Sequence, residues 1–245
     1  MTLYAERVET IGIVVPACNE EVRLPRCLAA LTAAADLLFG VDNAPRIRLI
    51  VVVDRSTDGT LAIAERWPGA EVVVSAAGRV GAARAAGVAR LLTTEARRGT
   101  PARQVWIACT DADSAVPTDW LLEQVRHARA GVELLLGTVR PDPDELAAGL
   151  LAAWRLRHQI ADGHPYVHGA NLGIRGDTYC AAGGFADVAA HEDTLLSHAV
   201  RQSGAAVLST GSAPVLTSGR ITGRTPDGLA HYLRELGELE VSLEA

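Results

Sequence analysis

Short apolar runs alternate with amphipathic segments along the first half of the chain. The apolar runs are rich in β-branched residues or leucine and lie at 11–15, 47–53 (with Arg48 as its one charged residue), 72–74, 105–109 and 134–136. Between them, leucine or alanine recurs at helical spacing over 24–38, 60–67, 78–98 and 118–130. Continuous apolar runs of this length are typical of strands buried on both faces of a sheet. Their alternation with helices over short connections predicts a parallel sheet with right-handed crossovers.

The second half of the chain carries more glycine, histidine and polar residues at turns. Helices are predicted over 146–162 and 194–202, followed by a short strand at 206–208. A last helix has an apolar side made of Leu229, Leu233, Leu236 and Leu239. We therefore expect an α/β fold in a single domain, with a mostly parallel central sheet flanked by helices.

Two aspartates follow the apolar run at 105–109. Asp111 and Asp113 are one residue apart, and Ser114 comes directly after them. The carboxyl ends of strands are where open α/β sheets bind ligands. Two hard oxygen ligands suit Mg²⁺ or Mn²⁺, and such a metal suits a substrate diphosphate. The alternative interpretation is an acidic turn at a strand end, because Asp and Ser favour turns.

Composition narrows the classes of protein to consider. The chain has 245 residues, 49% of them hydrophobic, and a formal net charge of −6 without a basic cluster. It can therefore bury a sizeable core, and nucleic acid is not expected as its main partner. We find no apolar run long enough to span a bilayer and no signal-peptide pattern. Four cysteines without CxxC spacing (Cys18, Cys27, Cys109, Cys180) predict buried free thiols in a reducing cytoplasm.

The chain contains no lysine: all 23 basic residues are arginine. This excludes Schiff-base chemistry and the lysine of the Walker A and protein-kinase motifs. Any phosphate must be met by arginine, by backbone N–H groups or by a metal. The abundance of alanine and arginine also favours a high-GC bacterial source.

Four polar motifs occur in a fixed order along the chain. They are PACNEE at 16–21, DRSTDG at 54–59, TDADS at 110–114 and HED at 191–193, with GRVGAARAAG at 78–87, GANLGIR at 169–175 and GGF at 183–185 between them. In order and residues, they resemble the family 2 glycosyltransferases with the GT-A fold. The resemblance extends from Ile11 to about Leu233.

The resemblance implies both a fold and an activity. It implies one GT-A domain, with a Rossmann-like nucleotide-sugar-binding half at about 8–140, an acceptor or catalytic half at about 141–226 and a C-terminal helix at about 227–245. The implied reaction is metal-dependent transfer of a sugar from a nucleotide-diphosphate donor, such as a UDP- or GDP-sugar, to an unidentified acceptor hydroxyl. Inversion and a cofactor of Mn²⁺ or Mg²⁺ also follow from the resemblance.

Six positions match family residues that contact the nucleotide, and one position matches the family's metal ligand. Pro16 and Ala17 would bring backbone close to the nucleotide, and Asn19 is expected to cap the next helix. Glu20 would bind the ribose or base, unless it is only a helix N-terminal acid. The remaining assignments are Asp54 to a base N–H, Arg84 to the nucleotide side, Asp111 to the ribose or a bridging water, and Asp113 to the metal. Many family members have Asn where this chain has Ala85.

The acceptor side carries the implied catalytic group. Asp193 resembles the family's general base, which takes a proton from the acceptor hydroxyl. Glu192 could be the base instead, because sequence does not orient either side chain. The sugar or acceptor pocket is expected to include His168, Gly169, Asn171 and Gly184. A late polar loop with Ser218, Arg220 and Arg224 could close over the diphosphate.

The alternative from a different class is a non-catalytic, nucleotide-sugar-binding or scaffolding member of the fold. The presence of both Asp113 and Asp193 argues against it. A dinucleotide oxidoreductase would need GxGxxG directly after a strand, which GRVGAARAAG does not match. The last helix is expected to pack on its own domain, although a second subunit in a homodimer or a membrane face could also cover it.

Overall fold

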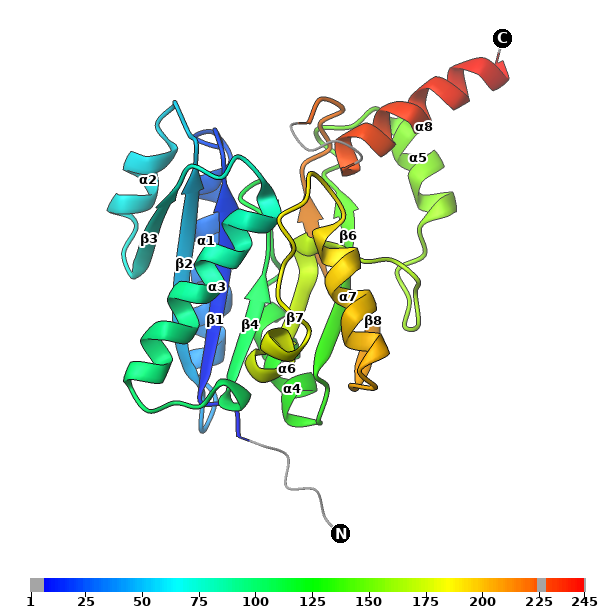
Figure 1. Ribbon diagram of the computed structural model, residues 1–245. Helices are drawn as coiled ribbons and strands as arrows, with labels where there is room; N and C mark the ends of the chain where they lie inside the picture. The colour runs from blue at the N-terminus through cyan, green and yellow to red at the C-terminus, as the bar shows by residue number, and fades with distance from the viewer. Residues whose placement is uncertain (1–6, 224–227, 245) are drawn as a thin grey trace.

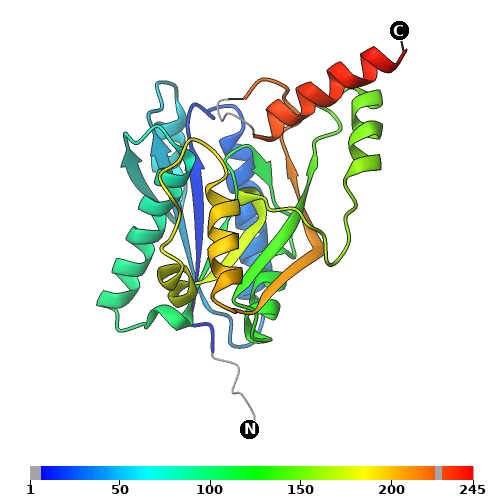
Figure 2. The ribbon, with the colours of Figure 1, turned by 45° about the vertical axis from the view of Figure 1, so that its right-hand side comes forward.

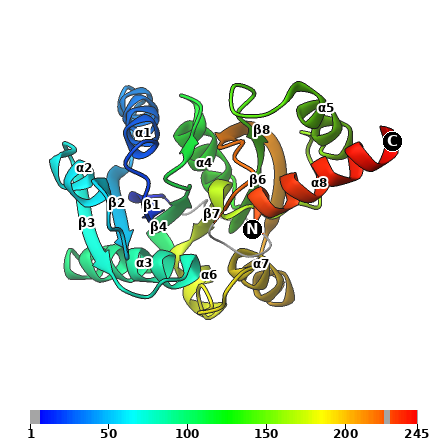
Figure 3. The ribbon, with the colours of Figure 1, turned by 90° about the horizontal axis from the view of Figure 1, so that it is seen from above.

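The computed structural model describes residues 7–223 and 228–244, with side chains up to residue 238. Its strands form one eight-stranded sheet in the order β3-β2-β1-β4-β7-β6-β8-β5. Helices cover both faces, as seen from above in Figure 3. The α/β fold with a central sheet flanked by helices is therefore confirmed.

The first half contains the expected strand–helix alternation. Its elements are β1 (Thr10–Ala17), α1 (Leu24–Phe39), β2 (Arg46–Asp54), α2 (Thr60–Arg66), β3 (Ala70–Ser75), α3 (Val80–Arg97) and β4 (Val105–Cys109). Strands β3, β2, β1 and β4 are parallel neighbours. Helices α1 and α3 lie on opposite faces of these strands (Figure 1). The apolar runs are buried between them, which fixes where the polar strand ends emerge.

The second half mixes strand directions. Its elements are β5 (Ser114–Ala115), α4 (Trp120–Arg129), β6 (Leu134–Pro141), α5 (Ala148–Arg157), β7 (Leu172–Arg175), α6 (Gly176–Ala181), α7 (Glu192–Gln202), β8 (Val207–Thr217) and α8 (Leu229–Glu244). Strand β7 is antiparallel to both neighbours, β4 and β6, and β5 is antiparallel to β8. Strands β6 and β8 are parallel. The antiparallel β7 joins the two parallel sets into one sheet.

Helices α5 and α8 form a pair beyond the main body of the sheet (Figure 2). Leu233 and Leu236 are buried in a cluster with Leu146, Ala153 and Trp154. The last helix thus packs on its own domain through part of its predicted apolar side. The side chain of Leu239 lies outside the described residues, as does the whole of Arg224.

Three local expectations are wrong. Asn19 does not cap a helix, because α1 begins later, at Leu24, next to Pro25. The backbone of Asn19 has a φ of 50°, and its side-chain oxygen accepts a hydrogen bond from the Thr57 N–H at 2.7 Å. Proline favours a first helical turn because it lacks the N–H that would be unpaired there. The helix predicted to reach residue 162 ends at Arg157. Of the four free cysteines, Cys180 is exposed and Cys18 is only half-buried, so burial was predicted correctly for Cys27 and Cys109 alone.

Candidate active site

The carboxyl ends of β1, β2 and β4 meet at one edge of the sheet and form a cavity of about 550 Å³. The parallel register sets Ala17 of β1 beside Val53 of β2, directly before Asp54. All but one of the residues predicted for the nucleotide and metal line this cavity: Pro16, Ala17, Glu20, Asp54, Asp111 and Asp113. A site at the carboxyl edge is what a parallel α/β sheet favours.

Asp54 has an unsatisfied acceptor in this cavity. Its side chain is buried, and its Oδ1 has no hydrogen-bond partner among the described residues. Buried polar atoms in proteins are nearly always paired, so an orphan beside a cavity indicates a ligand donor. An N–H group of a nucleobase is a donor of this kind.

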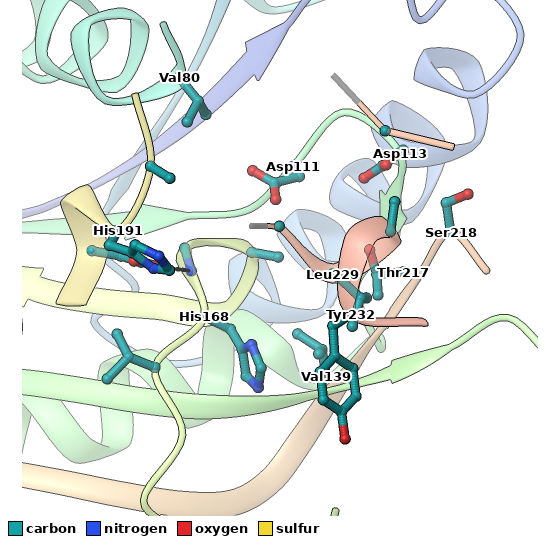
Figure 4. A pocket seen from close by; sticks show the side chains of 18 of the residues that line it. Val80, Asp111, Asp113, Val139, His168, His191, Thr217, Ser218, Leu229 and Tyr232 are labelled. Atoms are coloured by element: carbon teal, nitrogen blue, oxygen red, sulfur yellow. Dashed lines mark hydrogen bonds between the residues drawn. The ribbon is translucent and has the colours of Figure 1, made fainter. Parts of the chain in front are cut away.

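A second cavity of about 400 Å³ lies on the other side of the two aspartates. Its wall includes His168, Gly169, Glu192 and Asp193. The two cavities share four lining residues: Val80, Asp111, Asp113 and Arg220. Figure 4 shows Asp111 and Asp113 on one side of this pocket, with His168 and Tyr232 across from them. The aspartates therefore lie where two binding spaces meet.

Arg84 lines the second cavity and not the first. Its guanidinium contacts Asp111 Oδ1 at 2.5 Å through Nη2 and pairs with Glu192 through Nη1. The side chain is buried, which lowers the pKa of the guanidinium, but Asp111 and Glu192 outweigh burial and raise the pKa overall. Gly169 leaves room for this group, since a Cβ there would lie 2.5 Å from Arg84 Cζ. Arg84 is thus a buried cation that links the two halves.

Glu192 and Asp193 have different surroundings although they are adjacent. Glu192 is 3% exposed and is held by Arg84, and burial raises its pKa while Arg84 opposes the rise. Asp193 is half-buried, and its Oδ2 accepts from the Gly169 N–H at 2.7 Å. Its Oδ1 accepts from the Thr194 N–H at 2.7 Å. The α7 N-terminus thus orients the Asp193 carboxylate toward the cavity, whereas Glu192 is committed to an ion pair.

Asp113 is paired with the late loop of the chain. Arg220 contacts Asp113 Oδ2 at 2.8 Å and Glu20 Oε1 at 2.7 Å. Burial and the neighbouring Asp111 raise the pKa of Asp113 to about 6, although Arg220 opposes the rise. Sequence analysis predicted Arg220 near the diphosphate, but it did not predict the contacts of Arg220 with Asp113 and Glu20.

A row of rings borders the second cavity. Trp154 stacks on His158 with ring centroids 4.7 Å apart, and the edge of Tyr232 meets His158 at 5.1 Å. Tyr166 lies between His158 and His168, at 4.9 and 6.1 Å. Burial lowers the pKa of His168 to about 4, so this imidazole is neutral at pH 7. Sequence analysis missed the row, because its rings come from α5, a loop and α8.

Two residues predicted for the pocket do not line either cavity. Asn171 is 3% exposed, and its amide bonds the Trp120 indole, Thr138 O and Ala213 O at 2.8, 2.8 and 3.1 Å. Gly184 has a φ of 74° and lies against the Tyr179 hydroxyl, which accepts from the Phe185 N–H. Neither residue is therefore part of the surface of the two cavities.

The carboxylates suit a divalent cation that arrives with a diphosphate. Within the described ranges, no group of three or more His, Cys, Asp or Glu side chains could hold a metal by itself. Mg²⁺ is commonly held by one or two carboxylates, with substrate phosphates and water completing the shell. Asp111 and Asp113, both facing the two cavities, match that donor set.

Comparison with known proteins agrees with this architecture. The S. aureus protein TarS in complex with UDP-GlcNAc superposes with a TM-score of 0.61 at 14% identity, covering 94% of this chain and 65% of that one. A mannosyltransferase from Pyrobaculum calidifontis in complex with GDP-Man and Mn²⁺ gives a TM-score of 0.55 at 20% identity, covering 95% and 61%. These likenesses define the fold as GT-A.

The sequence identifies the family. Residues 12–178 match the model of glycosyl transferase family 2, and the chain belongs to this family. An uncharacterised glycosyltransferase of Mycobacterium tuberculosis is 34% identical over 149 residues, covering 61% of this chain and 55% of the relative. This chain therefore spans about half the length of the curated relatives it matches. Over the described part of the chain, no helix is long and apolar enough to cross a membrane.

Proposed function

We propose that the protein transfers a sugar from a nucleotide-diphosphate donor to an acceptor hydroxyl, with a divalent metal and with inversion at the anomeric carbon. The observation that carries the proposal is the meeting of two cavities at Asp111 and Asp113. A sugar attached to a diphosphate at that junction would face the second cavity, where Asp193 lies.

The first cavity suits the nucleotide. The orphan Oδ1 of Asp54 would accept an N–H of the base, while Pro16 and Ala17 offer backbone close by. Glu20 would accept from the ribose or base. The structural neighbours are in complex with UDP-GlcNAc or GDP-Man, which supports a UDP- or GDP-sugar as donor here. Asp113, assisted by Asp111, would hold Mn²⁺ or Mg²⁺, and the metal would offset negative charge on the departing diphosphate.

Asp193 is the better candidate for the general base. Its carboxylate would take the proton of the acceptor hydroxyl while that oxygen bonds to the anomeric carbon and the bond to the diphosphate breaks. Attack from the second cavity, opposite the leaving group, inverts the configuration. Glu192 would act as a positioning residue, because its carboxylate is buried against Arg84. The hydrogen bond from Gly169 to Asp193 would fix the direction of the base.

The decisive experiment is a thermal-shift panel with UDP, GDP, CDP and TDP, each with and without Mn²⁺, on wild type and D113A. Binding to the folded state raises the melting temperature by linkage. We expect one nucleotide to give a metal-dependent shift that D113A loses. If no nucleotide shifts wild type, the proposal fails. If binding is intact but the sugar of the matching donor is transferred to neither water nor any acceptor, the non-catalytic alternative holds.

A further inference from the structure

Arg220 bridges two carboxylates at the junction of the two cavities. Its Nη2 lies 2.8 Å from Asp113 Oδ2 and its Nη1 lies 2.7 Å from Glu20 Oε1. The Arg220 side chain is 25% exposed, and the carboxylates are 14% and 5% exposed. Partly buried contacts of this kind between a guanidinium and carboxylates are stronger than surface ion pairs. Asp113 is the same residue that the proposed function assigns to the metal.

We propose that Arg220 and the divalent metal compete for Asp113, and that the donor diphosphate resolves the competition by drawing Arg220 to itself. The metal would then bind weakly without nucleotide and tightly with it. This inference rests on the proposed function and adds a binding order to it.

The competition follows from geometry and charge. An oxygen ligand lies about 2.0–2.1 Å from Mg²⁺, so an N–H donor cannot use the same lone pair of Asp113 Oδ2. The other oxygen, Oδ1, accepts from the Ser114 hydroxyl at 3.3 Å. A guanidinium at this distance also repels a dication. Binding of the metal to Asp113 therefore weakens the contact with Arg220, and that contact in turn weakens binding of the metal.

Hydrogen bonds hold the backbone of the chain from Ser218 to Arg220, so we expect the exchange to take place by movement of the Arg220 side chain. Glu145 Oε2 accepts from the Ser218 hydroxyl at 2.5 Å and from the Gly219 N–H at 3.1 Å. The Arg220 N–H donates to Ser218 Oγ at 3.2 Å. These bonds anchor the base of a long side chain whose tip lies between both cavities.

A diphosphate is a suitable new partner for this tip. Its oxygens match the planar fork of a guanidinium and carry more negative charge than one carboxylate. The chain has no lysine to take this role. Arg84 is already held by two carboxylates, those of Asp111 and the buried Glu192. If Arg220 moves from Asp113 to the diphosphate, the Asp113 carboxylate becomes available to the metal when the donor binds.

The test is Mn²⁺ binding followed by electron paramagnetic resonance of the free ion, with Mn²⁺ alone and with the nucleoside diphosphate identified by thermal shift. We expect R220Q to bind Mn²⁺ alone about 5- to 150-fold more tightly than wild type, the usual range of coupling between two ligands. In R220Q the nucleotide should bind more weakly, and it should enhance Mn²⁺ affinity by a smaller factor than in wild type.

R79Q is the matched control. Arg79 lines the same nucleotide cavity, but its ion pair, at 3.0 Å, is with Asp187. R79Q removes one charge without releasing Asp113, so its Mn²⁺ affinity in the absence of nucleotide should rise far less. R220K keeps the charge but replaces the planar fork of the guanidinium with a more compact ammonium group, so we expect an intermediate affinity. A thermal melt of each variant verifies folding.

The outcomes separate this inference from the proposed function. If R220Q and R79Q bind Mn²⁺ with equal affinity, the effect comes only from the loss of one positive charge, and the inference is overturned. Weaker Mn²⁺ binding in R220Q would mean that Arg220 organises the metal site, and would overturn it as well. If wild type binds no Mn²⁺ with any of the four nucleotides, the proposed function fails together with the inference.

Discussion

Arg84 and Glu192 form a buried ion pair across 108 residues of sequence, joining the first turns of α3 to the start of α7. The same guanidinium contacts Asp111, so one cation sets the relative positions of a nucleotide-side carboxylate and the proposed base region. Arg84 and Asp111 come from the first half of the chain and Glu192 from the second, so the ion pair with Glu192 connects the two halves.

Removing this cation should destabilise the whole domain. In R84M, Glu192 and Asp111 would lose their shared partner while Glu192 stays buried, and such losses cost about 3–5 kcal/mol. We expect the free energy of unfolding in urea to fall by that amount. R90Q, which removes an arginine paired with Glu71 at the surface, should change it by less than about 1 kcal/mol. The double variant R84M/E192Q should recover part of the loss; no recovery would contradict the role of the pair.

The two acids at the start of α7 should differ in their effect on turnover. D193N should lower kcat by about 10²–10⁴, the usual contribution of a general base, with donor affinity unchanged. E192Q should lower stability as well as kcat, because its carboxylate pairs with Arg84. Steady-state kinetics and nucleotide binding of both variants decide which residue is the general base. D36N, a substitution of an exposed aspartate, is the control. A larger kcat loss in E192Q than in D193N would transfer the role of base to Glu192.

The parts predicted from sequence are those with a local signal. Strands β1, β2 and β4 are rich in apolar residues, and their parallel pairing fixes where Asp54 and Asp113 emerge. Strand β8 was predicted as three residues because its second part, STGSAP, alternates polar and small residues and is held by pairing with β6. The Arg84–Glu192 pair and the ring row join distant elements, so no spacing in the sequence reports them.

His168 should make stability depend on pH in a defined direction. Its pKa is lowered by burial from 6.5 to about 4, although Asp193 opposes the change. The unfolded chain therefore binds a proton near pH 6.5 that the folded protein does not bind until about pH 4, so stability falls as pH falls through this window. Between pH 7 and pH 5 this site should cost about 2 kcal/mol.

H168Q should remove that part of the pH dependence. Urea unfolding at pH 7 and pH 5 should show a loss smaller by about 2 kcal/mol in H168Q than in wild type. H198Q, a change at an exposed histidine of α7, should keep the wild-type dependence. An unchanged slope in H168Q would mean that His168 does not titrate in this window.

Tyr232 should affect the acceptor and not the donor. Its ring comes from α8, lines the second cavity and meets His158 edge-on at 5.1 Å. Aromatic contacts contribute about 0.5–1.5 kcal/mol beyond area burial, so loss of such a contact with the acceptor in Y232A should raise the KM for acceptor about 2- to 12-fold. The melting shift with nucleotide and Mn²⁺ should match wild type, because Tyr232 does not line the first cavity. F39A, at an exposed aromatic residue at the end of α1, is the control. If Y232A changes the melting-temperature shift with nucleotide but leaves the KM for acceptor unchanged, the row of rings belongs to the donor side instead.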